Sequence, residues 1–119
     1  MGSAQQGRVL LMWLYLSPGF LSVVAHRTEP EKLLVRARHP DHIHAVFPGV
    51  EVIHMPHADY PYRAVLDRTV VQSAVADYIK NMTYDNFKAS IEDSDYHGVC
   101  LDVWRTMWAY GRRYRRGGV

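Results

Sequence analysis

Residues 33–38 alternate between apolar and basic side chains, and this short pattern constrains the fold more than any composition value. Leu33, Val35 and Ala37 fall on one side of an extended strand, and Leu34, Arg36 and Arg38 fall on the other. A strand with one apolar and one charged side is typical of an antiparallel sheet that is covered on one face only. The segment therefore predicts a sheet with a core face and an open face.

Four more strands are predicted around this one. The apolar runs at residues 9–16 and 20–26 flank Ser17-Pro18-Gly19, which is a turn signal, so together they predict a hairpin. After the alternating strand, residues 50–55 and 62–66 predict a fourth and a fifth strand. The predicted sheet thus has about five strands, most of them antiparallel.

Helical periodicity appears between and after these strands. The predicted helices cover residues 40–47, 70–82, 85–91 and 98–110. The second has an apolar stripe with a 3.6-residue period, and Thr69 and Gln72 before and within it form a capping box. Gly111 is expected to end the last helix.

The order β-β-β-α-β-β-α-α-α lacks a regular βαβ alternation and predicts an α+β fold with the helices on one face of the sheet. We expect a single domain over residues 9–111, because 119 residues form one domain by ordinary size. A flexible segment at 1–8 precedes it, and a basic flexible tail at 112–119 follows. The basic residues of the tail are Arg112, Arg113, Arg115 and Arg116.

Composition excludes several classes of protein. With 48% hydrophobic and 22% charged residues, the chain is globular and not disordered. No apolar run reaches the length of a membrane span, so no membrane association is expected. The single cysteine, Cys100, allows no internal disulfide and fits a reducing, cytoplasmic location.

Six short blocks together resemble a small, uncharacterised protein family of bacteria and their viruses. The blocks are MWLY at 12–15, GFLS at 19–22, VRAR at 35–38, DYPYR at 59–63, YDNFK at 84–88 and VW at 103–104. The resemblance covers residues 12–108, but it implies no activity, cofactor or catalytic residue.

Histidines and the cysteine raise the question of a metal or thiol enzyme. The spacing of His39, His42 and His44 is echoed by His54, His57 and Asp59, which could hold a divalent ion. We favour surface histidines next to proline-bounded loops, since no cysteine ligand or known metal motif accompanies them.

Cys100 near a helix start, with His97 before it, could form an activated thiol. It also continues an apolar helical stripe, and a buried cysteine is the better reading. We therefore expect no enzyme, no catalytic residue, no metal and no cofactor.

The open face of the sheet is the remaining candidate site, because it combines aromatic and basic residues. The predicted binding residues are Trp13, Tyr15, Arg36, Arg38, Tyr60, Arg63, Arg112, Arg113, Arg115 and Arg116. Such residues anchor protein interfaces and also stack on bases and pair with phosphates. The plainer alternative is that Arg36, Arg38 and Arg63 only form ion pairs with Asp59, Asp67 or Glu51.

Our first functional hypothesis is a non-catalytic binding protein of bacterial or phage origin, an inhibitor or modulator of a protein complex. Its partner is expected to be another protein, and a homodimer is an alternative. The second hypothesis is a nucleic-acid-binding module that uses the sheet arginines and the arginine tail. The third is a small metal-dependent or thiol enzyme.

Overall fold

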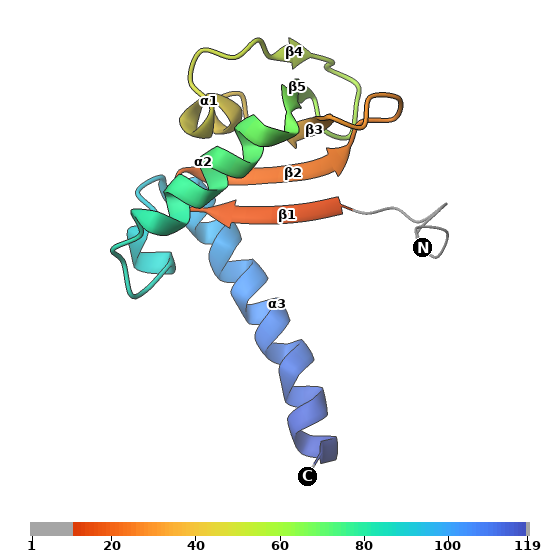
Figure 1. Cartoon of the computed structure of the whole chain (residues 1–119). Coiled ribbons are helices and arrows are strands. Elements are labelled where there is room, and N and C mark those ends of the chain that lie inside the picture. The colour runs from red at the N-terminus through yellow and green to blue at the C-terminus, as the bar shows by residue number, and fades with distance from the viewer. Residues whose placement is uncertain (1–10, 119) are drawn as a thin grey trace. The chain divides into compact units, whose positions relative to one another are not determined.

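A five-stranded antiparallel sheet forms the frame of the molecule (Figure 1). The computed structural model describes residues 11–118, with side chains through Arg115. The strands are β1 (Leu11–Leu16), β2 (Gly19–Ala25), β3 (Lys32–Ala37), β4 (Ile53–His54) and β5 (Tyr62–Asp67), and their order is β1-β2-β3-β5-β4. The predicted α+β class with a mainly antiparallel sheet is confirmed.

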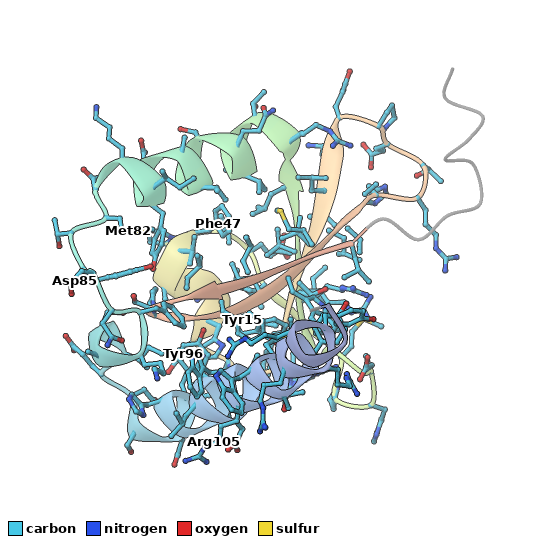
Figure 2. The ribbon with its side chains drawn as sticks, turned by 90° about the horizontal axis from the view of Figure 1, so that it is seen from below. Tyr15, Phe47, Met82, Asp85, Tyr96 and Arg105 are labelled. Atoms are coloured by element: carbon cyan, nitrogen blue, oxygen red, sulfur yellow. The ribbon has the colours of Figure 1, made fainter. Side chains whose placement is uncertain are left out.

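Two helices, α1 (His42–Val46) and α2 (Arg68–Lys80), pack on one face of this sheet. The alternating strand behaves as predicted, because Val35 and Ala37 are fully buried on that face. Ile43 joins them from α1, Phe47 from the residue after α1 (Figure 2 labels Phe47), and α2 adds Val71. Burial of this apolar surface is the main term that stabilises the sheet.

The hairpin between β1 and β2 is fixed by polar contacts from both helices. The backbone N–H of Ser17 donates to the hydroxyl of Tyr78 at 2.9 Å, and the N–H of Phe20 donates to Nδ1 of His42 at 3.1 Å. A Cβ on Gly19 would lie 2.5 Å from Cγ of His42, so only glycine allows this approach.

Two predictions within this region are wrong. Helix α2 begins at Arg68, directly after β5, and its N-cap residue is Asp67, whose side chain makes no capping hydrogen bond. Thr69 therefore lies inside the helix, and the predicted capping box does not form. Strand β4 is two residues long instead of six. Val50 and Val52, which the sequence predicts in this strand, lie outside the ladder and pack against the core cluster.

Contacts divide the chain into two compact units, Met1–Met82 and Thr83–Val119. The second contains the 3-10 turn η2 (Lys88–Ser90) and the long helix α3 (Ser94–Gly118). The helix predicted at 85–91 is reduced to η2, where the hydroxyl of Ser90 donates to the carbonyl of Phe87 at 2.6 Å. Such local side-chain bonds compete with a regular helix.

Helix α3 is longer at both ends than the sequence predicts. The carboxylate of Asp93 accepts the N–H of Tyr96 at 2.9 Å, which caps the helix four residues before the predicted start. Gly111 does not end the helix, so the predicted end and the departing tail are wrong: residues 112–118 are helical. The predicted single domain over 9–111 spans both units and stays a prediction, and the segment 1–8 lies outside the described residues.

Candidate interaction surfaces

The second face of the sheet, opposite α1 and α2, carries a row of predicted binding residues. Trp13 pairs with Ser22, Ser22 with Arg36, and Arg36 with Arg63, so these side chains lie in line across four strands. The strand order, which the sequence does not give, makes Arg36 and Arg63 direct neighbours. Ser22, fully buried between Trp13 and Arg36, was missed by the sequence analysis.

Aromatic residues occupy the β1 end of this face. The ring centroid of Phe20 lies 4.7 Å from that of Tyr15 and 6.1 Å from that of Trp13. Phe20 was not among the predicted site residues, although it is opposite Tyr15 in the hairpin and shares its face. Trp13 is more than half exposed and is the accessible member of the group.

Basic residues gather at the β3 and β5 end of the face in what we call the arginine–tyrosine cluster: Arg36, Arg38, Tyr60 and Arg63. The guanidinium carbons of Arg36 and Arg38 lie 4.4 and 4.3 Å from the ring centroid of Tyr60. The Nε of Arg63 donates to the carbonyl oxygen of Tyr60 at 3.1 Å. Tyr60 is only 5% exposed, so a single buried residue contacts all three arginines.

Ion pairing in this cluster is incomplete. Arg38 forms an ion pair with Asp59 at 3.2 Å, but Asp67 pairs with Lys32. In the described part of the chain, no carboxylate lies within 4.0 Å of Arg36 or Arg63. Arg36 donates from Nη2 to the hydroxyl of Ser22 at 2.8 Å, whereas its buried Nε has no partner among the described residues. The alternative of a face neutralised by ion pairs is thus confirmed only for Arg38.

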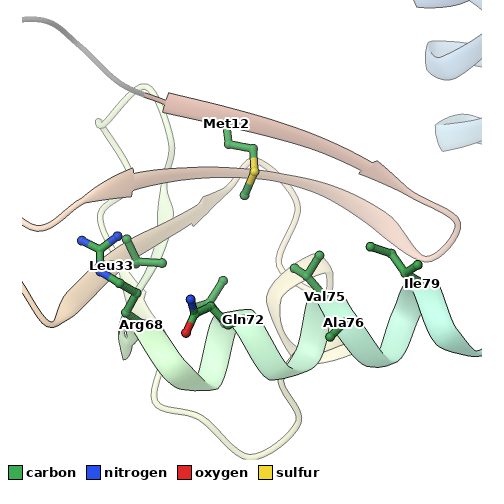
Figure 3. A pocket seen from close by; sticks show the side chains of 8 residues that line it. Met12, Leu33, Arg68, Gln72, Val75, Ala76 and Ile79 are labelled. Atoms are coloured by element: carbon green, nitrogen blue, oxygen red, sulfur yellow. The ribbon is translucent and has the colours of Figure 1, made fainter. Parts of the chain in front are cut away.

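A groove between the sheet and α2 was not predicted (Figure 3). It has a volume of about 370 Å³ and is lined mainly by aliphatic side chains, among them Met12, Leu33, Val75 and Ile79. Arg68 stands at one end, held by bonds of 3.1 and 3.0 Å to the carbonyl of Pro30. Ile79, which belongs to the predicted apolar stripe of α2, is 63% exposed. The groove can accept an aliphatic side chain.

The C-terminal half of α3 carries a second group of aromatic and basic residues, which we call the aromatic–basic segment (residues 104–115). Its exposed apolar residues are Trp104, Met107, Trp108, Tyr110 and Tyr114. Arg112 lies over the ring of Trp108 at 4.8 Å and Arg113 over that of Tyr110 at 5.4 Å. The segment contains four arginines and no acidic residue. The side chain of Arg116, the fourth arginine of the predicted tail, lies outside the described side chains.

The first turns of α3 differ from this segment because one side of them is buried, although Val99 on another side is exposed. Tyr96 and Cys100 are buried, and Figure 2 shows Tyr96 and Arg105 on opposite sides of the helix. Burial raises the pKa of the Cys100 thiol, and a weaker hydrogen bond from Tyr96 opposes this shift. Cys100 is therefore a buried hydrophobic residue and not an activated thiolate.

The histidines mostly have structural contacts. His39 stacks on His42 with ring centroids 4.7 Å apart, and His54 stacks on Tyr62 at 4.8 Å. Nε2 of His44 lies 2.8 Å from the carbonyl oxygen of Val50. Over residues 11–118, no three histidine, cysteine or acidic side chains are grouped to hold a metal ion.

None of the helices that the structure describes is long and apolar enough to cross a membrane. Comparison of the chain with models of protein families, with curated proteins and with solved structures found no match. The resemblance to a family of bacteria and their viruses therefore stays a prediction, and the function has to be argued from the surfaces themselves.

Proposed function

We propose that this protein is a non-catalytic binding protein whose partner is another protein, engaged by the aromatic–basic segment of α3. The observation that carries the proposal is the exposure of five large apolar side chains along one helix, from Trp108 at 46% to Tyr114 at 66%. Tryptophan, tyrosine, methionine and arginine are the residues enriched in protein interfaces.

The spacing of these side chains supports a helix-in-groove mode of binding. Trp104, Met107 and Trp108 are separated by the three- and four-residue steps that place side chains on one helix face, and Tyr114 lies seven residues, or two turns, after Met107. Arg105 pairs with Asp102 just before the segment at 3.5 Å, and the other three described arginines of the segment have no ion pair among the described residues. The partner therefore needs an apolar groove with a rim of carboxylates, which gives both apolar burial and charge complementarity.

A photo-crosslinking amino acid tests this proposal. p-Benzoylphenylalanine is placed at position 107 on the apolar side of α3, or at position 109 on the opposite side as the matched control. After irradiation in cells that naturally produce the protein, a discrete protein adduct is expected from position 107 only. Equal labelling from both positions, or no adduct from position 107, would contradict the proposal.

Nucleic-acid binding is the second candidate function, and the directly opposed Arg36 and Arg63 without a carboxylate favour it. It predicts binding to single-stranded DNA or RNA that weakens steeply as salt increases. Replacing Arg36, Arg38 and Arg63 together with alanine should abolish the binding. Unchanged binding by this variant would remove the sheet face from the hypothesis, and nuclease-sensitive adducts at position 107 would favour nucleic acid over protein.

A further inference from the structure

We propose that the arginine–tyrosine cluster is a binding site for an oxyanion, that is, a phosphate or carboxylate group of a ligand. This site lies on the sheet of the first unit and is independent of the aromatic–basic segment on which the proposed function rests. Three features support it: the rigid placement of the guanidinium groups, their uncompensated charge, and an unpartnered buried donor.

The backbone fixes the positions of the arginines. Arg36 and Arg63 are Cα partners on β3 and β5, so they leave the sheet side by side. Tyr60 holds Arg36 and Arg38 through its ring and Arg63 through its carbonyl oxygen. A site whose charged groups are held in this way loses little side-chain entropy when a ligand binds.

The charge of the cluster is not balanced. Three guanidinium groups face one carboxylate, Asp59, which lies at the exposed Arg38. Like charges placed directly opposite in a sheet are destabilising, and this effect is stronger where water is partly excluded. The excess of two positive charges matches a phosphate monoester, which carries about −1.5 to −2 near neutral pH.

The hydrogen bonds of Arg36 are also incomplete. Its Nη2 donates a hydrogen bond to the hydroxyl of Ser22, but the buried Nε has no acceptor among the described residues. A buried donor on a charged group without an acceptor is unfavourable. An oxygen that enters between Arg36 and Arg63 would supply this acceptor, and arginine binds phosphate and carboxylate oxygens in a bidentate manner.

Titration with inorganic phosphate tests the site, with acetate as the carboxylate probe and chloride at matched ionic strength as the reference. The full chain is followed by the ¹⁵N–¹H signals of the arginine side chains and by its Tm. Phosphate is expected to shift the signals of Arg36 and Arg63 saturably and to raise the Tm. In Arg63→Gln the affinity should fall roughly tenfold or more, because a bidentate charged contact is lost.

Controls separate this site from general charge effects. Arg27→Ala removes an arginine from an exposed loop and should leave phosphate binding unchanged. If Arg63→Gln does not fold, Arg38→Gln at the exposed edge of the cluster serves as the second variant. No saturable shift with phosphate or acetate, or full affinity in the glutamine variants, would overturn the proposal.

A second titration, with a 20-nucleotide thymidine oligomer, tests whether the oxyanion comes from nucleic acid or from a small compound. Competition between the oligomer and inorganic phosphate at Arg36 and Arg63 would identify the phosphates of nucleic acid as a source. If the oligomer binds without shifting the signals of Arg36 and Arg63, the ligands of this site are small phosphate or carboxylate compounds and not nucleic acid. Failure at this site would not affect the crosslinking result at position 107, so the two proposals fail separately.

Discussion

Arginines meet aromatic rings in two regions of this molecule, and the two regions are built differently. In the arginine–tyrosine cluster, Tyr60 is 5% exposed, and its ring lies under the guanidinium groups of Arg36 in β3 and of Arg38 just after this strand. In the aromatic–basic segment of α3, the rings are about half exposed, and Arg112 and Arg113 lie over rings four and three residues before them on the same helix.

The two arrangements are suited to different kinds of ligand. Strand pairing and a buried ring fix three arginines in a small volume, which suits a compact anion that must be held from several sides. A single helix with exposed rings offers a long surface whose apolar area becomes buried only when a partner covers it. Composition alone, which is arginine plus aromatics in both regions, does not distinguish them.

The largest effect is expected from removing the buried ring of the cluster. Tyr60→Ala should lower the free energy of unfolding by about 3 kcal/mol, as for other buried aromatic truncations. Tyr114→Ala on α3 should change it by no more than about 0.5 kcal/mol, because this ring is exposed. Urea unfolding followed by circular dichroism measures both values, and similar losses would remove the contrast between the regions.

The two halves of α3 can be compared through Cys100. Because burial raises the pKa of its thiol, alkylation by iodoacetamide at pH 8 should be roughly tenfold or more slower in the folded protein than in urea. At a pH below the ordinary cysteine pKa, the thiol keeps its proton in both the folded and the unfolded protein, so the free energy of unfolding does not depend on this group. Above that pH the unfolded protein loses the thiol proton first, so the free energy of unfolding falls as the pH rises. Equal alkylation rates would mean that the first turns of α3 are as exposed as its last.

Replacing a guanidinium group in the cluster tests its charge imbalance. Arg36→Met keeps a long side chain over Tyr60 but removes the charge opposite Arg63 and the unpartnered Nε. We expect unchanged stability or a gain of about 1 kcal/mol in phosphate-free buffer. Arg112→Met on α3 is the matched control and should have an effect below about 0.5 kcal/mol. A clear loss of stability in Arg36→Met would show that the cluster is balanced without a ligand.

Glycine replacements test the helix surface. Gly111→Ala and Gly98→Ala should each stabilise α3 by about 0.5–1 kcal/mol, since a Cβ at either position meets open space. Amide exchange of residues 108–115 measures the gain for Gly111→Ala. Gly111 lies on the apolar side of the helix and Gly98 on the opposite side, so only Gly111→Ala should reduce crosslinking from position 107. An equal reduction by both variants would point to helix stability instead of surface shape.

The smallest effect is expected from the one carboxylate of the cluster. Asp59→Asn removes an exposed ion pair with Arg38 and should change the free energy of unfolding by no more than about 0.5 kcal/mol. The affinity for phosphate should nevertheless rise a few-fold, because a competing anion is removed. Weaker phosphate binding in this variant would place Asp59 inside the site as a necessary partner.

Much of the fold follows from local sequence patterns. The alternation of Val35 and Arg36, and the hairpin before them, were read from side-chain order because a strand has only two faces. Helix ends were predicted less well. A glycine such as Gly111 in an exposed helix lowers stability without having to end the helix. Between Asn86 and Ser90, side-chain bonds to the local backbone accompany a 3-10 turn instead of the predicted helix.

Side-chain alternation is a local property of the backbone, so the order of residues along each strand is enough to place Trp13, Tyr15, Arg36 and Arg63 on the face opposite the core. Which of them are neighbours depends on how the strands are arranged in the folded sheet. Strand order placed Arg63 beside Arg36, and the loop before β5 brought Tyr60 under both Arg36 and Arg38. Pairing between distant strands depends on the packing of the whole core, which no short pattern encodes.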